Sequence, residues 1–240
     1  MDYKKIYESQ YGEKKLKIQK QLQFLGLRKI LKCWDINRYD MCYKVAEKGE
    51  KVLDIGCGDG SMLFRLIDKY DELYGIDIAP SRLTEARKTV AEKYSDLPKK
   101  FCFYEGNLDK KMEFESNFFD TIICLAILEH VYDIYSLVKE LYRVLKSGGY
   151  AIAEVPNIAY LKYRIKLLFG KLPITSSPYN WEEIGWDDGH IHYFTMKKLC
   201  ELFESQGFEI IKKTGSGFLA PLRNWRPSLL TGDLIIKATK

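Results

Sequence analysis

From residue 51 onward, the sequence alternates short runs rich in β-branched and aromatic residues with stretches in which apolar residues recur at helical spacing. Such alternation is typical of β-α-β units, whose strands pair in parallel within one sheet. We expect strands at 51–55, 72–78, 100–105, 119–125, 150–155, 208–213 and 233–239. A loop without a helical pattern joins the last two, so we expect them to be antiparallel at the edge of the sheet. The pattern therefore predicts an α/β fold around a mostly parallel sheet.

The length of 240 residues is enough for one large α/β domain with a sizeable core, so we expect residues 1–240 to form a single domain. Helices are expected at 61–69, from Pro80 onward, from Ile134 to the glycines at 148–149, and between Thr195 and Gly207. Residues 1–48 precede the sheet and are expected to cover one side of it with helices. Residues 157–194 interrupt the alternation, and we expect them to form an insertion on the substrate side.

The composition indicates a globular chain, with 46% apolar and 30% charged residues. No apolar run approaches the roughly 20 residues of a membrane span. The N-terminus lacks the apolar segment of a secretory signal, so we expect a cytoplasmic protein. Six cysteines are scattered without C-x-x-C pairs, which disfavours both a zinc site and a disulfide framework.

The net charge of +5 is concentrated at one end of the chain. Residues 1–34 hold nine Lys and Arg against three Asp and Glu, so the remainder is nearly neutral. An RNA-modifying enzyme that uses this basic N-terminal region is one alternative for the function. No RRM or KH pattern is readable, however, so nucleic acid is disfavoured as a partner. The sequence does not indicate an oligomeric state.

The stretch VLDIGCGDG at 52–60 follows the first strand and marks a ligand-binding loop. It is not a phosphate loop of the G-x-x-x-x-G-K-[ST] type, because no Lys follows Gly60. The dinucleotide pattern needs a third glycine where this chain has Ser61, and its pyrophosphate would lie beside Asp54 and Asp59. A cationic ligand suits these acids better. S-adenosylmethionine carries an ammonium and a sulfonium, so the loop favours this cofactor.

Two positions beyond the loop fit the same cofactor. Asp77 ends the second strand, 19 residues after Gly58, where a carboxylate can accept hydrogen bonds from both ribose hydroxyls. The alternative is that Asp77 only caps the helix that begins at Pro80. Asn107 follows the third strand and can offer its amide to an adenine edge, with Leu108 beside the ring. An ordinary turn asparagine is the alternative there.

Five segments together resemble the successive motifs of the class I S-adenosylmethionine-dependent methyltransferases, in that family's order and spacing. They are VLDIGCGDG at 52–60, GIDI at 75–78, EGNL at 105–108, FDTIICLAILEH at 119–130 and LKSGG at 145–149. The resemblance covers about residues 50–155 and implies a doubly wound, Rossmann-like, seven-stranded sheet with an antiparallel last strand. It also implies the cofactor contacts, which are Asp54, Gly56, Cys57 and Gly58 for the methionyl end, Asp77 and Ile78 for the ribose, Asn107 and Leu108 for the adenine, and Cys124 and Leu125 near the sulfonium.

The segment LAILEH at 125–130 bears on the methyl acceptor. It lacks the [NDS]-P-P-[YF] run with which relatives that methylate amides or adenine grip a planar nitrogen. It resembles instead the small-molecule branch, including quinone-biosynthesis O-methyltransferases, in which a Glu-x-x-Glu-His group can hold a divalent metal. Ala126 replaces the first Glu here, and two ligands alone make a poor site for a hard cation. We therefore expect a small-molecule acceptor and no metal.

Histidines supply the candidate bases. The segment DDGHIHYFT at 187–195 resembles the Gly-His-x-x-x-Phe-Thr segment of many small-molecule methyltransferases. A hydroxyl acceptor must lose a proton, and an imidazole suits that role, so we expect His130, His190 or His192 to act as the base, with Glu129 beside them. The expected acceptor is a hydroxyl of a glycan, lipid-linked or quinone-like metabolite. The alternatives are that His190 only steadies the turn before Thr195 and that His130 caps its own helix.

The start of the insertion is basic and amphipathic. Its apolar positions Ile158, Leu161, Ile165 and Leu168 stand beside Lys162, Arg164, Lys166 and Lys171, and residues 14–34 carry a second such pattern. These helices suggest peripheral contact with an anionic membrane or with the phosphates of a sugar nucleotide. The alternative is a solvated basic face over a stripe that packs on the core. Trp181 and Trp186 are candidates for stacking on an acceptor ring. A non-catalytic cofactor-binding protein is a further alternative.

Overall fold

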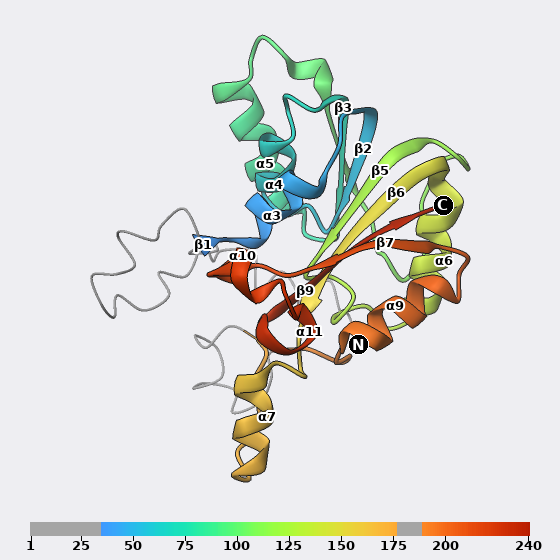
Figure 1. The fold of residues 1–240 in the computed structure, drawn as a ribbon. Coiled ribbons are helices and arrows are strands. Elements are labelled where there is room, and N and C mark those ends of the chain that lie inside the picture. The colour runs from blue at the N-terminus through green and yellow to red at the C-terminus, as the bar shows by residue number, and fades with distance from the viewer. Residues whose placement is uncertain (1–34, 177–188) are drawn as a thin grey trace.

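The fold is built on one central sheet of seven strands, seen edge-on in Figure 1. The computed structural model describes residues 35–176 and 189–240. The strand order is β4-β3-β2-β5-β6-β9-β7. The strands are β2 (Gly49–Ile55), β3 (Tyr70–Asp77), β4 (Phe101–Glu105), β5 (Phe119–Leu125), β6 (Leu145–Pro156), β7 (Glu209–Thr214) and β9 (Asp233–Thr239).

Strands β2 to β6 pair in parallel, whereas β9 is antiparallel to both of its neighbours, β6 and β7. The predicted seven-stranded, mostly parallel sheet with an antiparallel last strand is therefore confirmed. A small second sheet pairs β1 (Asp35–Ile36) with β8 (Gly217–Phe218). The pattern of single strands did not indicate this sheet, because two residues are too few to show an alternation.

Helices cover both faces of the large sheet, as Figure 1 shows. On one face α3 (Arg38–Val45), α4 (Ser61–Arg65) and α5 (Pro80–Lys93) bury residues such as Cys42, Leu63 and Leu83 against the strands. On the other face α6 (Ile134–Val144) and α9 (Met196–Glu204) bury residues such as Leu141 and Phe203. This two-sided burial explains why the parallel strands read as continuous apolar runs.

The helix expected from Ile134 ends earlier than its glycines. It stops at Val144, and β6 begins at Leu145 and continues through Gly148 and Gly149 with a register shift against β5. Gly148 has a φ of +77°, and a Cβ at Gly149 would lie 2.8 Å from the carbonyl oxygen of Asp120. The glycines therefore form an irregularity inside the strand instead of a helix end.

The remaining connections are short elements. The helix expected at 61–69 ends at Arg65, and the chain turns before β3 begins at Tyr70. A 3₁₀ turn occupies Pro98–Lys100. The β7–β9 connection, expected without helices, contains α10 (Ala220–Arg223) and α11 (Pro227–Leu230), which are too short to produce a helical pattern in the sequence.

The two predicted additions to the domain lie partly outside the described residues. Of the cover at 1–48, residues 35–48 contribute β1 and α3. Of the insertion at 157–194, the described part contains α7 (Leu161–Leu168), which projects from the body of the molecule in Figure 1. Trp181, Trp186 and the second basic pattern at 14–34 lie outside the described residues. In the part of the chain that the structure describes, no helix is both long and apolar enough to cross a bilayer.

Candidate functional site

The site lies where the strand order reverses. From β2 the chain builds outward through β3 and β4, and from β5 it builds in the other direction through β6. In doubly wound sheets this reversal opens a crevice at the carboxyl ends of the two central strands, where ligands bind. Here the glycine loop follows β2 and the segment 126–130 follows β5, so both candidate sets meet at this crevice.

The glycine loop folds back over the end of β3. The backbone N–H groups of Gly56 and Cys57 both donate to the carbonyl oxygen of Ile76, at 2.7 and 3.1 Å. Gly56 and Gly58 have φ values of +68° and +53°, a region that strains other residues. A Cβ at Gly56 would lie 1.9 Å from the side chain of Ile127. Glycine thus allows the loop to pass close to the segment that follows β5.

Asp77 ties this loop to the start of α5. One carboxylate oxygen accepts from the N–H of Gly58 at 2.8 Å, and the other accepts from the N–H of Ala79 at 2.8 Å. The residue is 5% exposed, and burial raises the pKa of its carboxyl. α5 has Ala79 as its N-cap residue and no side-chain cap hydrogen bond, so the alternative that Asp77 only caps this helix is not supported. Each carboxylate oxygen can accept a second hydrogen bond, so Asp77 has the capacity to bind the ribose hydroxyls. This role stays a prediction.

The other predicted cofactor residues differ in what they present to the crevice. Asp54 is buried, and burial followed by the charges of Asp77 and Asp59 raises the pKa of its carboxyl. Cys57 is buried, and burial also raises its thiol pKa. Ile78 is half-buried directly after β3. Acidic, poorly solvated surroundings of this kind favour a cationic group.

The remaining four predicted contacts lie on the two flanks of the crevice. Asn107 uses its side-chain oxygen to accept from the N–H of Asp109 at 2.9 Å, as an ordinary turn asparagine does, and Leu108 packs against the core. Cys124 is completely buried in the core that contains α6, so only its backbone can line the crevice. Leu125 is half-buried and packs on the opposite face.

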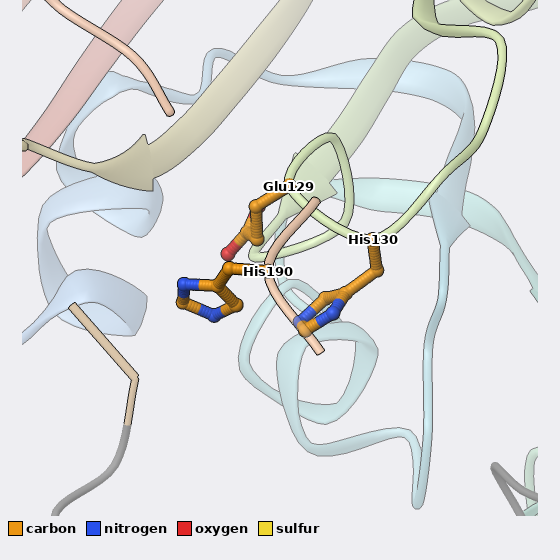
Figure 2. Close-up of side chains that lie close together, drawn as sticks. All are labelled: Glu129, His130 and His190. Carbon is orange, nitrogen blue, oxygen red and sulfur yellow. The ribbon is translucent and has the colours of Figure 1, made fainter. Parts of the chain in front are cut away.

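Three of the four predicted catalytic residues come together beyond the end of β5. The carbonyl oxygen of Glu129 accepts from the N–H groups of Ile191 and His192, at 2.8 and 3.3 Å, so the segment from Gly189 lies against it. One carboxylate oxygen of Glu129 and one ring nitrogen each of His130 and His190 lie within 4.8 Å of one another, and Figure 2 shows the three side chains close together. We refer to these three residues as the Glu-His-His cluster.

The two histidines of the cluster are held by neighbouring groups. The His130 ring nitrogen Nδ1 lies 3.2 Å from the carbonyl oxygen of Gly189, and the His130 and His190 ring centroids are 4.8 Å apart. Nδ1 of His190 lies 2.8 Å from the Thr175 hydroxyl. The alternative that His130 caps its own helix is wrong, because the side chain of Asp133 accepts from the first turn of α6.

His192 lies apart from the cluster. Its Nε2 atom is 3.2 Å from the carbonyl oxygen of Tyr132, and its ring lies near that of Phe194. The prediction that His192 could share the role of His190 therefore has no support in the geometry. Thr195 caps α9, as expected, by accepting from the N–H of Lys198 at 3.3 Å.

Glu129 is the electrostatic centre of the cluster. It is 1% exposed, and neither carboxylate oxygen has a hydrogen-bond partner within the described part of the chain. Burial, followed by the charge of Glu154, raises the pKa of Glu129 to about 8, although Arg38 opposes the shift. A carboxyl with this pKa is largely protonated at neutral pH.

Glu154 and Arg38 are site residues that the sequence analysis missed. Glu154 is fully buried in β6, and burial raises its pKa although Arg38 lowers it. One Glu154 oxygen lies 3.3 Å from Nη1 of Arg38, which is carried by α3, and the other has no partner among the described residues. A Glu inside the apolar run of β6 was the available signal for Glu154. Nothing in the sequence singled out Arg38.

The Glu-His-His cluster offers one more possible metal ligand than the sequence indicated. No metal was expected from the sequence, because Glu129 and His130 alone make a poor site for a hard cation. His190 adds a third, and a carboxylate with two imidazoles is a donor set suited to a divalent transition metal. The number of ligands therefore no longer argues against a metal, and its absence stays a prediction.

Comparisons with known proteins identify the domain that carries this site. Residues 53–153 match the family model described as "Methyltransferase domain". A ubiquinone biosynthesis O-methyltransferase from Aliivibrio fischeri is 28% identical over 109 residues, which is 45% of each chain. A demethylmenaquinone methyltransferase from Listeria welshimeri is 29% identical over 69% of this chain and 73% of its own length. The chain thus spans less than half the length of the ubiquinone relative that it matches.

The fold has close counterparts among solved structures. A crystal structure of an S-adenosylmethionine-dependent methyltransferase from Methanosarcina mazei superposes with a TM-score of 0.63 at 24% identity. The match covers 86% of this chain and 98% of that one. Residues 53–153 thus form a methyltransferase domain, and the sheet has the topology of S-adenosylmethionine-dependent methyltransferases of known structure.

Proposed function

We propose that this protein transfers the methyl group of S-adenosylmethionine to a hydroxyl of a small-molecule acceptor. The observation that carries the proposal is the position of the Glu-His-His cluster, which lies at the same crevice as the acidic glycine loop. When bound, the cofactor supplies a methyl group on a cationic sulfur. The acceptor oxygen forms the new bond to this methyl group, and the sulfur keeps the electron pair of the bond that breaks. The protein must hold the acceptor in line and remove its proton.

The acidic residues of the crevice support the proposed binding of the cofactor. Asp54 and Asp77 are both buried close to the loop, where a cationic ligand would offset the cost of their burial. Gly56 and Gly58 permit the close approach of the backbone. The residues present therefore fit the methionyl and ribose parts of S-adenosylmethionine.

His190 is the proposed base. It is half-buried, so it can contact both an acceptor and the buried Glu129. When its Nδ1 atom donates to the Thr175 hydroxyl, its Nε2 atom carries the lone pair that accepts the proton. The imidazolium that forms lies beside Glu129, where its positive charge lowers the carboxyl pKa and favours the carboxylate. Glu129 thus stabilises the charge that develops on His190.

The described part of the insertion forms the proposed acceptor wall. His190 and Thr175 both belong to residues 157–194, and the backbone of this segment is bonded to Glu129 at the end of β5. Together with the quinone-biosynthesis enzymes among the relatives, this favours a quinol, a lipid-linked compound or a glycan as acceptor. Those relatives carry small-molecule names, so we do not propose RNA as the substrate.

An acceptor panel tests the proposal. Purified protein is incubated with S-adenosylmethionine and with catechols, quinols, sugar nucleotides or lipid-linked precursors, and the demethylated cofactor and methylated products are measured by mass spectrometry. We expect O-methylation of at least one class, with His190→Ala reducing turnover about 10²–10⁴-fold and His192→Ala leaving it near wild type. Cofactor binding without turnover on any class would contradict the enzymatic role. Loss of turnover on chelation, restored by a divalent ion, would assign the cluster to a metal.

A further inference from the structure

Helix α7 presents its apolar side chains to solvent instead of to the core. None of its residues is buried, and the side chains of Leu168 and Phe169 are 80% and 73% exposed. Leu161, Ile165, Leu167 and Leu172 are also exposed. One alternative from the sequence was a stripe that packs on the core beneath a basic face. The structure excludes this arrangement for α7, because the stripe itself lies on the surface.

An eight-residue helix needs a packing partner. Helices this short are marginal in water, and in proteins their stability comes from burying an apolar face. In Figure 1, α7 (gold) projects away from the sheet, so the described elements of the body do not provide that burial. An exposed apolar patch of this kind marks an interaction surface.

The charge around α7 identifies the partner's chemistry. Residues 155–176 contain four basic residues (Lys162, Arg164, Lys166 and Lys171) and no Asp or Glu. The segment 214–232, which carries α10 and α11, likewise contains two Arg and no acid. The ring of Tyr160 and the guanidinium of Arg223 stack at 5.2 Å, so the two segments adjoin. Together they form one basic surface interleaved with apolar side chains, which we call the α7–α11 face.

Aromatic side chains complete this face. Trp225 is 82% exposed beside the exposed Leu222, and Tyr160 lines a cleft of about 490 Å³ between α7 and Arg223. Tryptophan and tyrosine are the residues enriched where protein meets the headgroup region of a bilayer, because each has an apolar ring and a polar atom. Basic, aromatic and apolar side chains on adjoining surface segments have the composition of an interfacial membrane anchor.

We propose that the α7–α11 face docks on the surface of an anionic bilayer. Leu168, Phe169 and Trp225 enter the headgroup boundary, and the Lys and Arg side chains lie against acidic lipids. The face adjoins the acceptor side of the crevice, because α7 follows directly from the carboxyl end of β6. Docking therefore brings the crevice close to the bilayer. The inference rests on the surface alone and does not depend on the proposed methyl acceptor.

Vesicle flotation tests the docking. The full-length protein is mixed with vesicles of phosphatidylcholine alone or of phosphatidylcholine with phosphatidylglycerol. We expect flotation with the anionic vesicles, weakened by salt. Leu168→Glu should weaken binding at least about tenfold, because it puts an acid where an apolar side chain enters the lipid. Ile211→Glu is the matched control, since Ile211 is an exposed apolar residue on the distant edge strand β7.

Replacing lysines on and off the α7–α11 face tests whether its positive charge binds the vesicles. Replacing Lys162 and Lys166 by Gln should weaken binding roughly 25-fold, because each basic residue near an anionic surface contributes separately. The same double change at Lys88 and Lys197, which are exposed on α5 and α9, should leave it unchanged. Equal loss in both pairs, or flotation with neither vesicle, would overturn the proposal. A dimer that dissociates on Leu168→Glu would overturn it as well, by assigning the face to a second copy of the chain.

Discussion

Replacing Glu129 by Gln should make the protein more stable at alkaline pH while it removes activity. The substitution keeps the shape of the side chain but cannot carry a charge. Glu129 is 1% exposed, and neither of its oxygens has a hydrogen-bond partner among the described residues. Its negative form is therefore a destabilising group in the folded site, and Gln removes it.

The size of the effect follows from the pKa. The carboxyl pKa rises from its usual 4.5 to about 8 in the folded protein. Between these two values the folded state holds a proton that the unfolded chain has released, so stability falls as pH rises through this window. Each pKa unit corresponds to about 1.4 kcal/mol, so the whole loss is at most about 5 kcal/mol. It is absent below pH 4.5 and complete above pH 8.

Urea unfolding between pH 4.5 and pH 8.5, followed by tryptophan fluorescence, measures this loss. At the acidic end, the free energies of unfolding of the wild type and Glu129→Gln should differ only by the constant effect of replacing a neutral carboxyl by an amide. At the alkaline end the variant should be more stable by several kcal/mol. Glu115→Gln, which alters an exposed carboxylate, is the control and should follow the wild type. Curves that stay parallel over the whole range would refute a protonated, buried Glu129.

Three further outcomes test the site. Asp77→Ala should weaken S-adenosylmethionine and its demethylated product alike by roughly 1.5–3 kcal/mol in calorimetry, since it removes charged acceptors; unchanged affinity would contradict the ribose assignment. Gly58→Val should abolish cofactor binding, because the position needs a φ of +53° and a Cβ there would lie 2.9 Å from Arg82. The circular dichroism spectrum should stay that of the wild type. Normal cofactor binding would show that the loop is only structural. With a working acceptor, His190→Ala should lower kcat and leave cofactor affinity unchanged, and a variant that keeps full kcat would exclude His190 as the base.

Local patterns were sufficient for the sheet. The bounds of β5 and β9 agree with the predicted strands, because strands that are buried on both faces leave a continuous apolar signal. The glycines at 148 and 149 were misread, since a glycine pair after a helical pattern is also a common helix end. In this chain the backbone of Asp120 packs against Gly149, and that contact is not visible from local sequence.

The site was predictable only in part, for a physical reason. The cofactor loop is contiguous, so its spacing indicated its chemistry. The Glu-His-His cluster joins segments 59 positions apart through backbone hydrogen bonds to Glu129, and no local pattern encodes such a contact. The pairing of Arg38 with Glu154 spans 116 positions and likewise depends on how α3 packs against the sheet.

The position of β9 has a consequence for the order in which the sheet can be completed. β9 is the last strand made, yet it lies between β6 and β7, and β7 pairs with no other strand of the sheet. During synthesis, β2 to β6 can assemble first, whereas β7 must wait for residues 233–239. Until then β6 is an unprotected apolar edge, which invites pairing with other chains. Shortening β9 should therefore produce aggregation during expression more readily than a folded protein with a loose last strand.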